Sequence, residues 1–568
     1  MKNKELSRIF AEIADALEFK GDSLYRIVAY RRVSRVLDEL TEDVESLAKE
    51  GRLREIPGVG GGIAEKIKEY LATGRMKKHE EVLSDVPQGL LALLRIQNLG
   101  PKTLALAHRE LSVKNLDSLV RVVEDGSLAK LFGMGEQRVE NIKKGIEIFL
   151  QARERIPIYE AVEISDKILS YMKTLPKVKR IAPAGSLRRM RETVGDIDIL
   201  ATGEDGGEII DFFAKYPEVS RVLASGKTKG SIIVRMRGDE RQVDLRTVPD
   251  DSYGAALQYF TGSKEHNIKL RSIAKEKGLK ISEYGVFKGD EKTAGRTEED
   301  VYKAVGLPYI PPELREDRGE VEAALERKLP QLIEPSDIRG DLHVHSTYSD
   351  GHSTIEEIAE FAKSVGYEYI AICDHSKSVR YAKGVSEERL KKEMDEIDDL
   401  NKKLNGVRVL KGIEVDVLSD GTMDFSDELL DRLDVVVAAV HMGFKKNVTE
   451  RLVAAIENSR IDIIAHPTGR LISKREGYDV DLERVMEKAR EYDKVLELNA
   501  YYDRLDLGEL QLRSAKEMGI KISIGTDAHS VGELRWMRYG VGIARRGWLE
   551  KDDVVNTLNY KEILNAFK

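Results

Sequence analysis

Hydrophobic residues recur at two different spacings along the chain. The first stretch has apolar residues three and four positions apart, the spacing of one helix face, at Ile9, Phe10, Ile13 and Leu17. Similar patterns continue to about residue 150, so we expect a helical N-terminal part. From about residue 151 to 315, helical patterns mix with strand-like runs at residues 196–201, 231–235 and 241–248. This middle part should combine helices with a sheet.

Short, continuous hydrophobic runs alternate with helical patterns in the C-terminal part. They predict seven strands, at residues 341–345, 369–373, 407–415, 434–440, 461–465, 494–498 and 521–525. Alternating strands and helices favour a parallel sheet, and seven such units indicate a closed or nearly closed barrel. Before them, a segment rich in proline and charge at residues 308–335 predicts a domain end and a linker.

Composition limits the kind of protein this can be. The 568 residues exceed what one hydrophobic core supports, so several domains are expected. The contents of 41% hydrophobic and 34% charged residues are typical of a soluble globular protein, and we find neither a signal peptide nor an apolar run long enough for a membrane span. The single cysteine, Cys373, cannot form an internal disulfide, which fits the reducing cytoplasm. The net charge of −8 is uneven, slightly basic up to residue 330 and acidic beyond it, and does not exclude nucleic acid.

Three similar turns, each rich in glycine, precede predicted helices. Two have a glycine on either side of an apolar residue, and the third has Asn98 in place of the first glycine. Such a turn directs backbone N–H groups outward, where they can bind a phosphate without reading a base. One copy is often only a tight turn, but three copies resemble the helix-hairpin-helix motif of DNA-binding proteins. The expected DNA contacts are Gly58, Gly60, Gly100, Gly133 and Gly135.

Carboxylates in the middle part suit a magnesium site. Asp196 and Asp198 lie two positions apart in one predicted strand, so their side chains share a face, and Asp244 lies in another strand. Three carboxylates on adjacent strands can hold two Mg²⁺ ions for nucleotidyl transfer. An acidic strand end is the alternative, but Gly185-Ser186 followed by Gly195-Asp196-x-Asp198 is more specific and resembles the nucleotidyltransferase superfamily. Ser186 and Arg189 are expected to bind triphosphate oxygens.

The block at residues 256–263, with Asn267 and Arg271 after it, closely resembles the nucleotide pocket of X-family DNA polymerases such as polymerase beta. The resemblance implies that Tyr259 and Phe260 exclude a 2′-hydroxyl and that Asn267 contacts the base edge. It also implies that Arg271 meets the template strand. The implied nucleotide-binding residues are Gly185, Ser186, Arg189, Gly195, Tyr259, Phe260, Gly262 and Asn267. The chain departs from polymerase beta at Lys264, where that enzyme has an acid, and at Gln242, where it has an arginine beside the third catalytic aspartate.

Lys66 falls where this family often has a Schiff-base lysine that removes 5′-deoxyribose phosphate. A lysine beside a phosphate-binding hairpin is ordinarily a backbone-phosphate contact, so both readings stay open. Arg26 and Gly62 replace other DNA-contacting lysines of the animal enzyme.

Histidines and carboxylates gather at the ends of the C-terminal strands. Barrel enzymes place their chemistry at the carboxyl ends of strands. Nine such residues exceed what one ion needs and suit two or three ions of zinc, manganese or iron. They are His343, His345, Asp350, His375, Glu414, His441, His466, Asp527 and His529. Any one of these histidines alone would be read as a core or surface residue.

This C-terminal half looks like the polymerase and histidinol phosphatase (PHP) domain, with every ligand position filled. When fused to bacterial or archaeal X-family polymerases, the domain is similar to ones with 3′–5′ exonuclease, abasic-site endonuclease and 3′-phosphatase activities. Two alternatives stay open: a small-molecule phosphatase fused to a polymerase, and a DNA-binding scaffold with vestigial sites.

The predicted fold is multidomain, and the predicted protein is a monomeric enzyme of base excision repair. We expect it to fill short gaps in primer-template DNA with dNTPs, using Mg²⁺ or Mn²⁺ at the polymerase site, without contact to a membrane. The expected parts are a helical DNA-binding domain (1–80), a helix-hairpin-helix domain (81–150), an α+β nucleotidyltransferase palm (151–245), a thumb-like subdomain (246–318), a linker (319–337) and a (β/α)7-type PHP barrel (338–568).

Overall fold

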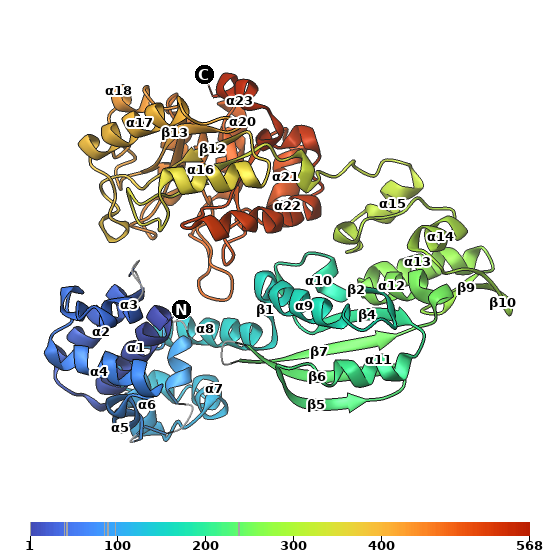
Figure 1. The fold of residues 1–568 in the computed structure, drawn as a ribbon, viewed down its shortest axis with the longest axis horizontal. Coiled ribbons are helices and arrows are strands. Elements are labelled where there is room, and N and C mark those ends of the chain that lie inside the picture. The colour runs from blue at the N-terminus through green and yellow to red at the C-terminus, as the bar shows by residue number, and fades with distance from the viewer. Residues whose placement is uncertain are drawn as a thin grey trace. The chain divides into compact units, whose positions relative to one another are not determined.

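The computed structural model describes residues 2–38, 40, 44–84, 86–87, 90–96, 98–236 and 239–567. The chain forms two compact units (Figure 1). The first contains residues 1–154 with 473–475, and the second contains residues 155–472 with 476–568. Within the described residues, no helix is both long enough and apolar enough to cross a membrane.

The first unit is helical, as the apolar spacing predicts. Its helices are α1 (Lys2–Lys20), α2 (Leu24–Asp38), α3 (Val44–Lys49), α4 (Gly61–Thr73), α5 (Lys77–Ser84), α6 (Pro101–Leu111), α7 (Leu116–Glu124) and α8 (Glu136–Glu154). The predicted stripe of α1, from Ile9 to Leu17, is buried in the core of this unit. Phe10 stacks on Tyr30 of α2 with 6.0 Å between ring centroids, which fixes α1 across α2.

The second unit begins with a five-stranded sheet in the order β2-β4-β7-β6-β5, in which β4 and β7 are parallel and the other pairs are antiparallel. The strands are β2 (Val178–Pro183), β4 (Ile197–Gly203), β5 (Val219–Ser225), β6 (Lys229–Met236) and β7 (Asp239–Thr247). Around them lie α9 (Ile158–Met172), α10 (Gly185–Arg188), α11 (Gly206–Phe213) and the short pair β1 (Ile156–Pro157) and β3 (Thr193–Val194).

A smaller α+β part follows this sheet and has a core of its own. It contains α12 (Tyr253–Thr261), α13 (Lys264–Glu276), β8 (Lys280–Ser282), β9 (Gly285–Lys288), β10 (Glu291–Ala294), α14 (Glu298–Ala304) and α15 (Glu320–Leu325). The segment 319–337, expected as a linker, departs from that prediction. Val321 and Ala324 of α15 are buried in this core, because apolar residues on one face of the short helix pack against it.

The C-terminal half is a barrel of seven parallel strands in sequence order, as predicted. They are β11 (Gly340–Val344), β12 (Tyr369–Ile372), β13 (Arg408–Asp416), β14 (Val435–Ala439), β15 (Ile463–Ile464), β16 (Val495–Asn499) and β17 (Ile522–Gly525). Beyond the end of β17, Ala528 forms a parallel bridge with Val344 of β11, which brings the two outer strands together. The barrel is therefore nearly closed.

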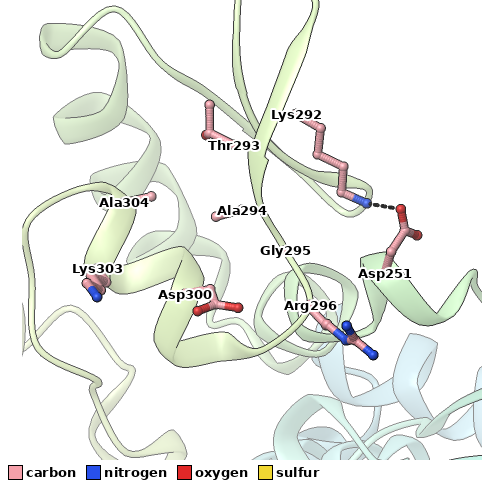
Figure 2. Close-up of a pocket in the computed structure, with 9 residues that line it drawn as sticks. All are labelled: Asp251, Lys292, Thr293, Ala294, Gly295, Arg296, Asp300, Lys303 and Ala304. Atoms are coloured by element: carbon pink, nitrogen blue, oxygen red, sulfur yellow. Dashed lines mark ion pairs between the residues drawn. The ribbon is translucent and has the colours of Figure 1, made fainter.

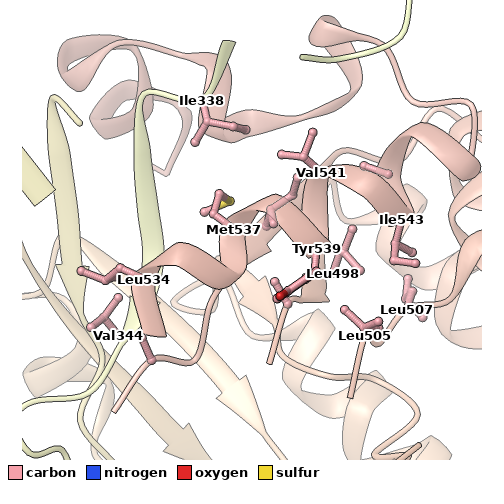
Figure 3. Packing of buried hydrophobic residues seen from close by; sticks show 14 of the residues in the cluster. Ile338, Val344, Leu498, Leu505, Leu507, Leu534, Met537, Tyr539, Val541 and Ile543 are labelled. Carbon is pink, nitrogen blue, oxygen red and sulfur yellow. The ribbon is translucent and has the colours of Figure 1, made fainter. Parts of the chain in front are cut away.

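Helices surround the barrel strands (Figure 1). They are α16 (Ile355–Ser364), α17 (Glu387–Asn401), α18 (Asp427–Leu430), α19 (Val448–Glu457), α20 (Leu482–Glu491), α21 (Glu509–Glu517), α22 (Met537–Arg546) and α23 (Tyr560–Ala566). Figure 3 shows α22 presenting Met537, Val541 and Ile543 to the apolar interior. The strands hold the site residues at their carboxyl ends. The helices cover the outward-facing side of the strands.

Candidate active sites

The structure places two of the palm carboxylates side by side. Asp198 of β4 lies opposite Asp244 in the parallel pair with β7. Asp196 directly precedes β4 and is exposed. Strand pairing thus brings together residues that are 46 positions apart in the sequence, as the alternating pattern predicts.

Gly185 approaches this cluster more closely than any other residue type could. It has a φ of 59°, and a Cβ atom there would lie 2.5 Å from Oδ2 of Asp198. A side chain would collide with the carboxylate and would strain the left-handed backbone. The loop that carries Ser186 can therefore lie directly against the carboxylates.

Burial and neighbouring negative charges disfavour the ionised form of Asp198 when no cation is bound. Burial, followed by the charges of Asp244 and Asp196, raises the pKa of Asp198 to about 6. A divalent cation would remove this cost, and hard oxygen donors are the ligands that Mg²⁺ prefers. The donor set fits a magnesium or manganese site.

Asp244 has a cation of its own that the sequence did not reveal. Nζ of Lys229 lies 2.8 Å from Oδ2 of Asp244, while the Ser231 hydroxyl and the Gln242 amide donate to Oδ1 at 2.6 and 3.0 Å. Burial opposes ionisation, but these donors together outweigh it and lower the pKa of Asp244. Lys229 and Ser231 alternate along β6, so knowledge of the pairing between β6 and β7 would have identified them.

The residues expected around the sugar and base lie together at the end of α12 and the start of α13. Tyr259 and Phe260 form an edge-to-face pair with 5.2 Å between ring centroids. The Asn267 amide donates to the Tyr259 carbonyl at 2.7 Å, and Nε of Arg271 donates to the Asn267 carbonyl at 3.2 Å. Gln258, not identified from the sequence, donates to Oδ1 of Asn267 at 2.7 Å and fixes its amide.

Arg189 does not lie open for a triphosphate. Its side chain is buried, with Nε donating to Glu316 at 3.0 Å and Nη1 donating to the Thr261 carbonyl. A Cβ atom at Gly262 would lie 3.1 Å from Nη1, so this glycine makes room for the guanidinium. Ser186 is half-buried, and Gly195 lies just before Asp196.

The three turns in the first unit share their backbone conformation. Gly58, Asn98 and Gly133 have φ values of 89°, 67° and 78°, the left-handed region that the motif requires. Gly60 and Gly100 each precede the first turn of a helix in extended conformation, as N-caps of α4 and α6. Gln97 lies outside the described residues.

Two charged residues, Lys66 and Glu136, lie beside these turns and affect how well each could bind a phosphate. Nζ of Lys66 donates to the Gly62 carbonyl at 2.8 Å, which places the amine within the first turn of α4 beside the Gly58 hairpin. In the third turn, α8 begins with Glu136 directly after Gly135, so the first turn of this helix carries a negative charge, which disfavours an anion there. This turn is therefore less suited to phosphate than the first two.

All nine predicted ligands of the barrel meet at one end of it. Three groups have ligand atoms within 4.8 Å of one another: His345, Asp350, His375 and His529; His343, His345 and Asp527; and His375, Glu414 and His441. His466, the ninth residue, lies 3.0 Å from Oε1 of Glu414 through Nε2. Glu414 is central, because Nδ1 of His375 and Nε2 of His441 lie 2.7 and 3.2 Å from its oxygens.

Several buried histidine nitrogens in this cluster lack hydrogen-bond partners in the part of the chain that the structure describes and are suited to bind a metal ion. Among the described residues, Nε2 of His343 and Nδ1 of His345 are buried without a hydrogen bond. Burial opposes protonation of His441 and His529, but neighbouring carboxylates outweigh it and raise the pKa of each to about 9. Burial opposes ionisation of Glu414, but the charges of His441, His375 and His343 outweigh it and hold the pKa of Glu414 well below its ordinary range. Protons thus neutralise carboxylates that metal ions would otherwise neutralise.

A layer of supporting residues around the ligands escaped the sequence analysis. Glu497 on β16 accepts from Nδ1 of His343 at 2.7 Å and orients that ring. Asp416 on β13 accepts from the His441 amide at 2.9 Å. Arg504 lies 3.6 Å from Asp527 through Nε and adds a positive charge at the site. The alternation along β13 from Glu414 to Asp416 was the available signal; Arg504 lies in a loop and gave none.

A cavity of about 630 Å³ lies in the thumb-like part (Figure 2). Lys292, Arg296 and Lys303 contribute its positive charges, and Lys292 is paired with Asp251 at 2.9 Å. Its lining shares no residue with the carboxylate cluster or with the Gly185 loop, so this cavity is not part of the polymerase site.

Family models match four parts of the chain in the order of these structural parts. They are a helix-hairpin-helix domain at residues 1–76, the DNA polymerase beta palm at 155–248, the DNA polymerase beta thumb at 256–316 and the PHP domain at 341–502. Fold and site together define an X-family polymerase joined to a metal-binding PHP barrel.

The whole chain has a curated relative of the same architecture. This chain is 40% identical, over 99% of both chains, to "DNA polymerase/3'-5' exonuclease PolX" of Bacillus subtilis (strain 168). The chain belongs to this family, the X-family DNA polymerases that carry a PHP domain. It is also 27% identical to DNA polymerase lambda of Rattus norvegicus, over 55% of this chain and 56% of that protein. The barrel is similar to a "Probable phosphatase" of Thermoanaerobacter sp. (strain X514), 31% identical over 38% of this chain and 89% of that protein.

Proposed function

We propose that this protein fills short gaps in DNA during base excision repair and trims 3′ ends with a second, separate site. The observation that carries the proposal is the presence of two complete donor sets in one chain. One set is made of carboxylates on β4 and β7, and the other combines imidazoles and carboxylates at the end of the barrel. Each set matches a different metal chemistry.

In the palm, Asp196, Asp198 and Asp244 would hold Mg²⁺ or Mn²⁺. Two such ions, when bound, help a primer 3′-hydroxyl attack the α-phosphate and stabilise the leaving pyrophosphate. Lys229 holds the Asp244 carboxylate in place through its 2.8 Å contact. Ser186, with Arg189 when it leaves Glu316, would bind the triphosphate oxygens.

The neighbouring pocket would select the nucleotide. Tyr259 and Phe260 would fill the space next to the sugar and exclude a 2′-hydroxyl. Asn267, fixed by the Gln258 amide and the Tyr259 carbonyl, would present its side chain to the base edge. Arg271 would meet the template strand from the next turn of α13.

In the barrel, the nine ligands would hold two or three ions of zinc, manganese or iron. Such ions, when bound, lower the pKa of a water molecule and bind the phosphate oxygens. Arg504 would bind the phosphate of the scissile bond. Glu497 orients the His343 ring, and Asp416 lies 3.4 Å from Nδ1 of the His441 ring. We infer a 3′–5′ exonuclease, with abasic-site endonuclease and 3′-phosphatase activities as further reactions of the same site.

DNA would be bound by backbone amides of the hairpins at Gly58, Gly60 and Gly100, with Gly133 and Gly135 forming a weaker contact because Glu136 follows them. Lys66 would bind a backbone phosphate beside the first hairpin; a Schiff-base role in removing 5′-deoxyribose phosphate is the second candidate. The protein would act as a monomer in the cytoplasm, where its single, buried cysteine stays reduced.

The proposal is tested on a DNA substrate with a one-nucleotide gap, in Mg²⁺ and in Mn²⁺ separately. Asp198→Ala should abolish nucleotide incorporation and keep 3′ degradation, and His343→Ala should do the reverse. If one substitution removed both activities, the two-site proposal would be wrong.

A small-molecule phosphatase is the second candidate for the barrel, because its relative in Thermoanaerobacter is named a phosphatase. Turnover of the same preparation on a phosphorylated metabolite and on a DNA 3′ end separates the two. Faster turnover of the metabolite would favour this second candidate.

A further inference from the structure

A row of buried, alternating charges joins the palm to the barrel within the second unit. Glu316 accepts from Nε of Arg189 at 3.0 Å, and Nη1 of Arg546 lies 2.9 Å from the same oxygen. Nε of Arg546 in turn pairs with Glu509 of α21. The Arg546 side chain is only 1% exposed and that of Glu316 9%, so water screens these charges weakly.

Arg546 also holds the backbone of Arg189, the residue proposed to bind the triphosphate. Its Nη1 donates to the Arg189 carbonyl at 2.6 Å. One turn earlier in α22, a Cβ atom at Gly542 would lie 2.4 Å from Cε of Met190, so the helix is seated directly against the residue after Arg189. One guanidinium of the barrel thus holds both the main chain of Arg189 and the carboxylate that binds its side chain.

We propose that Arg546 is a positioning residue for nucleotide binding in the palm. This rests on the proposed function, in which Arg189 binds the triphosphate. Three guanidinium groups face the single carboxylate of Glu316. Arg189 and Arg546 contact the same oxygen at 3.0 and 2.9 Å, and Nη1 of Arg191 lies 3.8 Å from the other oxygen, so each is held less tightly than it would be alone. Arg189 can therefore exchange Glu316 for the more highly charged triphosphate. Without Arg546, Glu316 would lose one of its two close guanidinium partners, bind Arg189 more tightly and compete more strongly with the nucleotide for it.

The neighbouring Arg545 offers a matched control. It lies on the same helix and ties it to the thumb-like part, with Nε donating to Glu313 at 2.8 Å and Nη1 donating to the Ile333 carbonyl at 2.8 Å. Within the described residues, its hydrogen bonds reach neither Glu316 nor Arg189. Loss of Arg545 weakens the attachment of α22 without changing the partners of Arg189.

The experiment compares Arg546→Met with Arg545→Met in the full chain, by steady-state insertion of one nucleotide into a gap. We expect KM for the dNTP to rise about tenfold in Arg546→Met with kcat within about twofold, the effect of one hydrogen bond to a charged group. Exonuclease activity reports that the variant is folded. An unchanged KM in Arg546→Met, or an equal rise in Arg545→Met, would overturn the proposal.

Glu316→Gln supplies a test of opposite sign, which also decides the matter if Arg546→Met fails to fold. The amide keeps the shape but releases Arg189 from its ion pair, so KM should fall severalfold; an unchanged or raised KM overturns the proposal.

Arg189→Ala separates this inference from the proposed function. If Arg189→Ala leaves KM unchanged, the proposed role of Arg189 fails. If it raises KM and Arg546→Met does not, only the positioning role of Arg546 fails.

Discussion

Asp198→Asn should stabilise the palm when metal ions are absent, although it removes one of the proposed metal ligands. The wild-type carboxyl has a pKa of about 6 in the folded protein, against an ordinary value of 3.8. Folding therefore favours its protonated form, and that contribution is complete below pH 3.8. It is lost as the pH rises through 6. At pH 7.5 the ionised side chain costs the metal-free fold about 3 kcal/mol, the free-energy equivalent of this difference in pKa.

Asparagine has nearly the same shape as aspartic acid but carries no charge at any pH. The variant should therefore avoid this cost at pH 7.5. Its advantage should shrink as the pH falls from 6 towards 3.8, where the wild-type carboxyl is itself neutral. A bound divalent cation should reverse the order, because it stabilises the wild-type carboxylate cluster and binds the variant more weakly.

Hydrogen exchange isolates the palm from the other parts of the chain. Amides of β4 and β7 exchange through opening of this sheet, and a difference of about 3 kcal/mol corresponds to roughly hundredfold slower exchange. We would compare wild type and Asp198→Asn at pH 7.5 in EDTA and again in Mg²⁺, with barrel peptides as the internal reference. Equal or faster exchange of β4 in the variant in EDTA would refute the reasoning, and so would the same order in Mg²⁺.

Three further predictions concern residues that the structure adds. Lys229→Met should lower kcat for nucleotide insertion by roughly tenfold, because Asp244 loses a charged partner, while Lys229→Arg retains most activity and exonuclease activity serves as the control. Glu497→Gln should weaken metal binding to the barrel by about 10- to 100-fold in equilibrium dialysis and leave polymerisation intact. Because the pKa values of His441 and His529 are raised to about 9, metal binding must displace protons. Barrel affinity should therefore be weaker at pH 6.5 than at pH 8.5, with proton release seen by calorimetry in two buffers; affinity independent of pH would contradict this.

The chemical groups of both sites could be predicted from the sequence because each depends on spacing within one element. The two-residue interval between His343 in β11 and His345 directly after it turns both side chains to the same side of an extended chain. Strands alternating with helices also limit the topology, because parallel strands put their carboxyl ends at the same edge. The seven strands were therefore predicted close to where they lie, and the structure brings the nine candidate ligands together at their ends.

The segment before the barrel shows where local pattern fails. Its prolines and charges were typical of a linker, but Val321 and Ala324 complete the core of the thumb-like part. Two apolar residues in a short charged stretch carry too little periodicity to indicate burial. Their burial depends on a partner surface that distant residues supply.

The sequence by itself determined which donors the protein carries and on which strands, since side-chain direction follows from the repeat of a single element. Only the tertiary structure decided which partners those donors have. Lys229 reaches Asp244 because β6 pairs with β7 in one register, and Arg189 is held by Glu316 and Arg546 because α22 lies against its loop. Such contacts join segments up to hundreds of residues apart, and their geometry is fixed by strand order and packing, which no local pattern encodes.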